Sequence, residues 1–199
     1  MGAEDEKELI ARLRAGDERA FADLVNRYHL SMVRVASTFV PSRAVAEEVV
    51  QDAWLGVVRG LPRFEGRSSL KTWIFRILVN RARTTGAREP RTVELDTGDG
   101  PGDDRFTAQG AWREPPVIWT DDIEDRLAAP EMAGRVREVV ELLPESQRQV
   151  VTLRDIEGLT SGEVCDLLSI SEGNQRVLLH RARTQVRAML EDDVRKWEA

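Results

Sequence analysis

The stretch that decides the fold, residues 160–190, reads TSGEVCDLLSISEGNQRVLLHRARTQVRAML. Thr160 and Glu163 fit the capping box S/T-x-x-E, in which side chains and backbone at a helix start satisfy each other's free donors. The pattern predicts one helix over 160–168 and a second over 171–192, with only two residues between them. Two helices joined by so short a turn have the layout of a helix-turn-helix, whose second helix enters the major groove of DNA.

The second of these helices carries a basic stripe opposite an apolar face. At about 100° per residue, one face holds Gln175, Leu179, Ala182 and Val186, and the amide of Gln175 needs a partner there. Positive charges edge the other side at helical spacing: Arg176, His180, Arg183 and Arg187. Such a stripe suits contacts with phosphates and base edges. A solvated amphipathic helix would show the same angular pattern, but the short turn, the capping box and the arginine density together favour DNA.

A second candidate surface lies on a helix predicted over 69–85, after a basic loop that holds Phe64 and Arg67. Beside its apolar face runs a mixed stripe: Thr72, Trp73, Arg76, Asn80 and Arg83. Single-stranded nucleic acid suits such a surface, because arginines hold the backbone while aromatic rings stack on unpaired bases. Taken alone, these residues favour the ordinary alternative, in which Trp73 is core and the arginines are solvated.

The helix predicted over 43–60 has a face that a single core explains poorly. This face holds Glu47, Gln51, Trp54 and Val58. It could dock a partner protein, or it could pack against another helix of the same domain. The residues leave both interpretations open.

The 199 residues include 41% hydrophobic and 32% charged residues, which is enough apolar surface for a core. The net charge of −6 is segregated, with +4 in residues 1–88, −7 in 89–130 and −3 in 131–199. One cysteine, Cys165, and two histidines exclude a disulfide framework and disfavour a metal site, so we expect no metal or cofactor. The polar N-terminus and the short apolar runs predict a reduced, cytoplasmic protein with no membrane insertion.

The chain divides into three parts. Helical periodicity runs through residues 5–88 and returns at 131–195, so we expect an all-α fold of two small helical domains. Residues 89–130 are rich in Gly, Pro and Asp, which predicts a long acidic linker that is disordered or partly docked. The sequence has no P-loop, G-x-S-x-G or HExxH motif, so we expect no enzyme.

These segments, in this order, resemble the extracytoplasmic-function (ECF) sigma factors of bacteria. Two segments resemble region two of this family: AEEVVQD at 46–52 and RFEGRSSLKTWIFRILVN at 63–80. Two others resemble region four: LPESQRQV at 143–150 and GLTSGEVCDLLSISEG at 158–173. Several independent motifs at family spacing make the match specific, and it covers nearly the whole chain outside the linker.

The resemblance implies an alternative sigma factor that binds core RNA polymerase, directs it to promoter DNA and helps to melt the minus-ten element. The residues it implies for polymerase docking are Glu47, Gln51, Asp52 and Trp54. Those implied for the displaced single strand of the minus-ten element are Phe64, Arg67, Lys71, Trp73, Arg76, Asn80 and Arg83. Those implied for the minus-thirty-five duplex are Asn174, Arg176, Val177, His180, Arg181 and Arg183.

The resemblance also implies roles for the linker and for a further partner. The linker would run through the polymerase toward the path of nascent RNA, and its charge of −7 fits a segment that stands in for nucleic acid in a basic channel. An anti-sigma protein is an expected partner. The stretch from Trp112 to Trp119 has no family role, and we expect its aromatic residues to pack on a domain and keep the free protein compact.

The sequence departs from the family pattern near the start of the second helix of the helix-turn-helix. Gln175 and Val177-Leu178 stand where the family commonly has a Val and a Ser-Arg pair, so Leu178 removes an expected phosphate contact.

Two other classes of function remain. A stand-alone helix-turn-helix regulator with a helical partner-binding domain is the main alternative, and a helical interaction protein without DNA is another. A sigma factor needs Trp73, Arg76 and Asn80 to meet melted DNA, whereas the other two classes do not.

Overall fold

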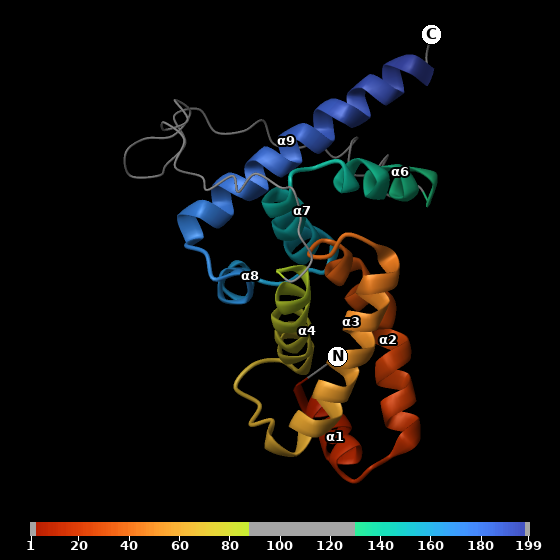
Figure 1. The fold of residues 1–199 in the computed structure, drawn as a ribbon, viewed down its shortest axis with the longest axis vertical. Helices are drawn as coiled ribbons and strands as arrows, with labels where there is room; N and C mark the ends of the chain where they lie inside the picture. Colours follow the sequence, from red (N-terminus) through yellow and green to blue (C-terminus); the bar gives the residue numbers. More distant parts are fainter. Residues whose placement is uncertain (1–2, 88–129, 198–199) are drawn as a thin grey trace.

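The computed structural model describes residues 3–87 and 130–197 of the chain, and both stretches are helical (Figure 1). The described residues contain no strand, which confirms the predicted all-α class. The N-terminal part contains α1 (Ala3–Arg14), α2 (Glu18–Ser37), α3 (Arg43–Gly60), a 3-10 turn (Leu61–Arg63) and α4 (Leu70–Gly86). The C-terminal part contains α6 (Pro130–Glu141), α7 (Glu145–Val151), a π-helical turn (Thr152–Ile156), α8 (Ser161–Leu168) and α9 (Glu172–Trp197).

Short polar side chains cap the N-terminal ends of α2, α3 and α4. Asp17 caps α2 by accepting hydrogen bonds of 3.0 and 3.1 Å from two backbone N–H groups of its first turn. Gly16 precedes it at a φ of +79°, a conformation that glycine adopts without steric cost. Ser42 and Ser69 cap α3 and α4 in the same way. These local signals confirm the predicted boundaries to within about two residues.

The core of the N-terminal part lies between α2, α3 and α4. Its largest fully buried side chains include Leu24, Met32, Val35, Val50, Val57, Leu70, Ile74, Phe75 and Leu78. Fully burying such a side chain stabilises a fold by about 1.5–3 kcal/mol before the entropy of ordering is counted. The packing therefore fixes which side of α4 points inward and which side is left for other contacts.

The C-terminal part has its own apolar cluster between α6, α7 and α9. The cluster contains Val139, Val140, Leu143, Val151, Ala182, Val186 and Leu190. Three of these residues, Val139, Val140 and Leu143, lie at the end of α6 and directly after it. Helix α9 continues to Trp197, beyond the predicted end at Asp192.

The two parts pack directly on each other, which the sequence did not predict. Helix α4 lies beside α8, and α2 lies beside the π-helical turn (Figure 1). One apolar cluster crosses this junction and joins the N-terminal core to Val150, Leu153, Leu159, Val164, Leu167, Leu168 and Leu178. The predicted linker and its Trp112–Trp119 stretch lie outside the described residues.

The Asp17 cap gives a pH-dependent prediction. Hydrogen bonds from the backbone of Ala20 and from the side chain of Arg12 hold the pKa of Asp17 below its ordinary value. A carboxyl group whose pKa is lowered by folding adds stability above its unfolded-state pKa, and this stability is lost as the pH falls through the folded-state pKa. We therefore expect Asp17→Ala to lower the unfolding temperature at neutral pH, with no difference from the wild type in strong acid. Calorimetric scans across pH test this, with Asp23→Ala as an exposed control. The prediction is contradicted if Asp23→Ala lowers the unfolding temperature as much as Asp17→Ala does, and by the same amount at every pH.

Candidate nucleic-acid interface

The start of α4 is held in place by side chains from α1. Glu6 accepts a 2.9 Å hydrogen bond from the backbone N–H of Leu70, adding to the cap that Ser69 provides. Arg14 donates hydrogen bonds to the backbone carbonyls of Leu61 and Phe64 in the preceding loop. The loop and the first turn of α4 are therefore positioned by contacts that the sequence pattern did not reveal.

The structure places Phe64 in the core, which corrects the expectation that its ring is free to meet unpaired bases. Phe64 is only 4% exposed, and its ring centroid lies 4.8 Å from that of Trp73. Trp73 is half-buried and packs closely over Gly60, where an added Cβ would come within 2.9 Å of the indole. The aromatic pair thus supports the loop in this conformation, and only Trp73 retains exposed surface.

An exposed amide lies in a hollow between α3 and α4. Asn80 is exposed and lines an open surface pocket of about 510 Å³ together with Asp52, Ile77, Arg81, Thr84 and Thr85. Arg81 and Asp52 form an ion pair of 3.8 Å in that pocket, bridging the two helices. A pocket with one amide and hydrogen-bonding neighbours has the chemistry to hold a base by its edge.

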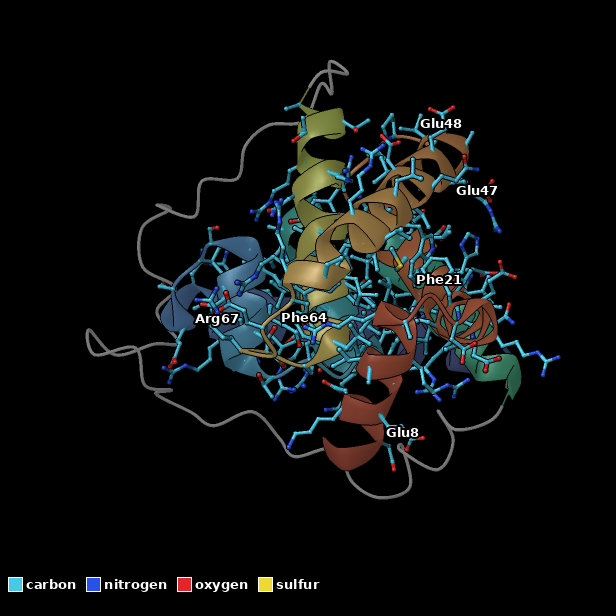
Figure 2. All side chains as sticks on the ribbon, turned by 90° about the horizontal axis from the view of Figure 1, so that it is seen from below. Glu8, Phe21, Glu47, Glu48, Phe64 and Arg67 are labelled. Atoms are coloured by element: carbon cyan, nitrogen blue, oxygen red, sulfur yellow. The ribbon has the colours of Figure 1, made fainter. Side chains whose placement is uncertain are left out.

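The predicted basic residues of this surface are divided between solvent and the C-terminal part. Arg67 is 86% exposed and pairs with Glu65 at 3.0 Å (labelled Arg67 in Figure 2). Arg76 is half-exposed and lies 3.6 Å from Asp166 of α8. Arg83 donates a 2.6 Å hydrogen bond to the backbone carbonyl of Leu168, and burial lowers the pKa of Arg83.

Two further residues of α4 also face the C-terminal part. Thr72 is 2% exposed, and its hydroxyl donates a 2.5 Å hydrogen bond to the Glu163 carboxylate. Burial by itself raises the pKa of Glu163. Hydrogen bonds from Thr72 and Thr160 lower this pKa by more than burial raises it, so the net shift is downward. Lys71 donates to the backbone carbonyl of Glu157 and lies 3.8 Å from its carboxylate.

Only some of the residues predicted to dock on polymerase are exposed on α3. Gln51 and Asp52 are exposed, and Glu47 pairs with Arg43 at 3.0 Å. Trp54 is 9% exposed and packs edge-to-face on Phe21 with centroids 5.8 Å apart, which corrects its assignment to a docking face.

Two apolar side chains on the same helix are exposed: Val58, which the sequence analysis placed on this face, and Leu55, which it missed. Leu55 and Val58 are 53% and 50% exposed. They stand on α3 near Gln51 and Asp52, so this face combines exposed apolar and polar side chains. Figure 2 shows Glu47 and Glu48 well separated from Phe64 and Arg67, so α3 and the loop before α4 offer separate surfaces.

The helix-turn-helix predicted at the C-terminal end is present. Thr160 and Glu163 form the capping box, and Ser171 caps α9 with a 3.2 Å hydrogen bond from the backbone N–H of Asn174. The turn is closed by Ser169 in the left-handed conformation, with a φ of +57°. The local sequence signals therefore predicted this motif correctly.

The buried amide of Gln175 links the two helices of the motif. Gln175 is 1% exposed, and its Oε1 accepts a 3.0 Å hydrogen bond from the hydroxyl of Ser161. Its Nε2 is buried with no hydrogen-bond acceptor among the described residues. Leu178 is 9% exposed within the core, so at this position the chain has an apolar contact where the family commonly has a basic residue.

The candidate duplex-reading residues differ in how far they reach solvent. Asn174 and Arg176 are exposed, whereas Val177, His180 and Arg181 are half-buried. Arg183 makes two hydrogen bonds, of 2.7 and 2.8 Å, to the carboxylate of Asp155 within its own domain. These bonds raise the pKa of Arg183 against the opposing effect of burial. The first turns of α9 therefore present Asn174 and Arg176 to solvent.

Neither a metal centre nor a membrane span is found in the parts of the chain that the structure describes. Residues 3–87 and 130–190 bring together no group of His, Cys, Asp or Glu that could hold a metal ion. No described helix is long and apolar enough to cross a bilayer.

The half-satisfied amide of Gln175 gives a prediction about stability. A buried donor without a partner costs about 1–3 kcal/mol, and methionine has a similar length without polar hydrogens. We expect Gln175→Met to raise the free energy of unfolding by about 1 kcal/mol, and Gln175→Ala to lower it by about 2 kcal/mol or more because a cavity forms. Urea unfolding measures both. A loss of stability in Gln175→Met as large as that in Gln175→Ala would contradict the prediction.

Two family models match separate parts of the chain. The model described as sigma-70 region 2 matches residues 24–91, and the model described as sigma-70, region 4 matches residues 133–186. The ECF RNA polymerase sigma-E factor of Escherichia coli (strain K12) is 32% identical over 181 residues, which is 89% of this chain and 90% of that protein. The RNA polymerase sigma-H factor of Pseudomonas aeruginosa is 29% identical over 97% of each chain.

Solved structures show the same fold. A structure of CnrH in complex with the cytosolic domain of CnrY matches with a TM-score of 0.58 at 24% identity, covering 94% of this chain and 98% of that one. The sigma factor RpoE from Bartonella quintana, solved with the anti-sigma factor NepR, matches with a TM-score of 0.54 at 20% identity, covering 85% and 97%. The two matched regions, the relatives and the fold agree, and the chain belongs to the ECF family of RNA polymerase sigma factors.

Proposed function

We propose that this sigma factor binds core RNA polymerase through α3, opens the minus-ten element with the loop before α4 and with α4 itself, and reads the minus-thirty-five element with α9. The observation that carries this proposal is the exposed amide of Asn80 in the hollow between α3 and α4, beside the half-exposed guanidinium of Arg76. An unpaired base fits a pocket with an amide, and its phosphates fit nearby arginines. As an initiation factor of this kind, the chain would act in the cytoplasm and catalyse no reaction itself.

Polymerase docking is proposed for the exposed part of α3. Glu47, Gln51 and Asp52 supply polar contacts, and the exposed Leu55 and Val58 add apolar area beside them. Interfaces combine an apolar centre with a polar rim. Trp54 supports this surface from beneath through its contact with Phe21.

Strand capture is proposed for the exposed residues around α4. Arg67, Trp73, Arg76 and Asn80 can be reached by a single strand in the present conformation, whereas Lys71 and Arg83 face the C-terminal part. Phe64 contributes by supporting Trp73 from the core side. The arrangement suits stacking on one ring and electrostatic contact with the strand backbone.

Duplex reading is proposed for the first turns of α9. Asn174, Arg176, Val177, His180 and Arg181 lie on the part of the helix that reaches solvent, and Arg183 stabilises it through Asp155. Residues 131–199 carry a net charge of −3, so this part has little general attraction for DNA. Promoter affinity is therefore expected to depend on the holoenzyme.

An anti-sigma protein is a further proposed partner. The Bartonella quintana sigma factor with the same fold was solved with its anti-sigma factor NepR. The exposed apolar side chains of α3, Leu55 and Val58, offer a surface to which such a protein could bind. This proposal predicts competition between the anti-sigma protein and core polymerase for the chain.

Run-off transcription with purified core polymerase tests the central proposal. Adding the chain is expected to produce transcripts from its promoters, and Asn80→Ala is expected to slow open-complex formation about tenfold, since a base-edge contact contributes about 1–3 kcal/mol. The variant should still bind core polymerase, because the docking residues are on α3 and the substitution leaves Asp52, which shares the pocket with Asn80, unchanged. Asn26→Ala, which removes an exposed amide from α2, is the matched control. Equal open-complex formation by the Asn80 variant and the wild type would remove Asn80 from the site.

Salt dependence tests the proposed contact of Arg176. An arginine that neutralises one phosphate contributes about one unit to the slope of binding against salt concentration. Arg176→Ala is expected to weaken promoter binding by the holoenzyme and to reduce that slope by about one. Arg137→Ala, an exposed arginine on α6, should leave the slope unchanged. If both variants keep the wild-type slope, Arg176 does not contact a phosphate.

A further inference from the structure

Arg81 lines the same hollow as Asn80, and neither the sequence analysis nor the proposed function gives it a role. It follows Asn80 directly on α4, and among the residues that line the hollow it alone is basic. Its side chain is 38% exposed, so part of the guanidinium can be reached from solvent. An amide and a cation on α4 therefore border one open space.

Two glycines of α3 make room for a row of side chains on α4. Trp73, Ile77 and Arg81 follow one another at intervals of four residues, so they lie along one side of that helix. A Cβ at Gly60 would come within 2.9 Å of the Trp73 indole. A Cβ at Gly56 would come within 3.1 Å of the Arg81 guanidinium and 3.0 Å of Ile77. The guanidinium therefore lies over Gly56, in space that a larger residue would take.

The carboxylate of Asp52, one turn before Gly56 on α3, restrains the guanidinium of Arg81. The two groups are 3.8 Å apart, which is close enough for attraction but too long for a hydrogen bond. The N–H donors of Arg81 therefore remain available to a third group. By contrast, the hydroxyl of Thr84 donates a 2.9 Å hydrogen bond to the backbone carbonyl of Asn80. Arg81 is thus held in position while its donors stay free for a ligand.

The pairing with Asp52 also indicates which kind of group Arg81 would bind. A carboxylate in the same pocket repels a phosphate, because like charges repel each other. The pair of Asp52 and Arg81 together carries no net charge, which suits a neutral ligand. A base offers ring nitrogens and carbonyl oxygens as acceptors, and arginine commonly donates to them. The pocket therefore suits the edge of an unpaired base better than the backbone of the strand.

We propose that Arg81 is a further specificity-determining residue of this sigma factor, which donates hydrogen bonds to the edge of the unpaired base that Asn80 holds. This inference rests on the proposed function of the Asn80 pocket. Asp52 and the space over Gly56 position the guanidinium before a strand arrives, so less side-chain entropy is lost on binding. Replacing Arg81 lowers the preference of the holoenzyme for one base at the captured position.

Binding of the holoenzyme to a forked promoter tests this assignment. The fork is duplex upstream and carries the minus-ten element as an unpaired strand, in which each position is replaced in turn by an abasic site. For the wild-type chain, one abasic position should weaken binding at least tenfold. Arg81→Ala should weaken binding of the intact fork about tenfold and should bind the fork with that abasic site as the wild type does, because the base is already absent. Fluorescence anisotropy measures the dissociation constants.

Further variants separate a base contact from general charge. Arg81→Lys keeps the charge but loses the planar fork of donors, so it should recover little of the affinity. Gly56→Ala keeps Arg81 but displaces its guanidinium and should weaken binding as well, whereas Gly134→Ala, whose Cβ enters open space on α6, should not. Arg19→Ala removes an exposed arginine of α2 and is the matched control for the charge. Circular dichroism confirms the helix content of each variant.

The outcomes distinguish this inference from the proposed function. Loss of affinity in Arg81→Ala that disappears at one abasic position supports the inference. It is overturned if Arg81→Ala binds the intact fork like the wild type, or if its loss is equally large on every abasic fork. In the second case, recovery by Arg81→Lys would indicate a phosphate contact instead. If no abasic position matters and Asn80→Ala also binds like the wild type, the proposed function of the pocket is itself wrong.

Discussion

Glu157 places a carboxylate in the junction of the two domains, and the cations that compensate it, Arg34 and Lys71, both belong to the N-terminal domain. A buried carboxylate is costly unless it is paired. When the domains part, water solvates Glu157 and both cations, so the cost of separation is far smaller than the loss of one partner within a closed junction. The polar contact therefore specifies how the domains meet without making the closed state permanent, and the apolar cluster around it supplies the remaining attraction.

Helix α4 has to satisfy three requirements at once. One side, with Ile74, Phe75 and Leu78, is core, and its side chains are fully buried. A second side carries Lys71 and Thr72 against the C-terminal domain, and a third leaves Asn80 open in the hollow beside α3. The core, the domain junction and the open hollow therefore each use a different side of the same helix.

Local signals were enough to predict the helix-turn-helix, because a capping box such as that of Thr160 and Glu163 acts over three or four residues. The same reasoning identified Asn80 and Arg76 as surface groups. It misplaced Phe64 and Trp54, because spacing along a helix does not show which neighbouring ring covers an aromatic side chain. It also missed the domain junction: Arg34 and Glu157 are 123 positions apart, and no local pattern relates them.

Double electron–electron resonance between spin labels on the two domains measures most directly whether the C-terminal domain packs on α4 in the free chain and separates from it in the promoter complex. Labels at Arg59→Cys in α3 and Gln185→Cys in α9, on a Cys165→Ser background, occupy exposed positions outside the junction. The account predicts one narrow distance distribution for the free chain and a clearly longer distance in the complex with core polymerase and promoter DNA. The same distribution in both states, or a broad one in the free chain, would contradict it.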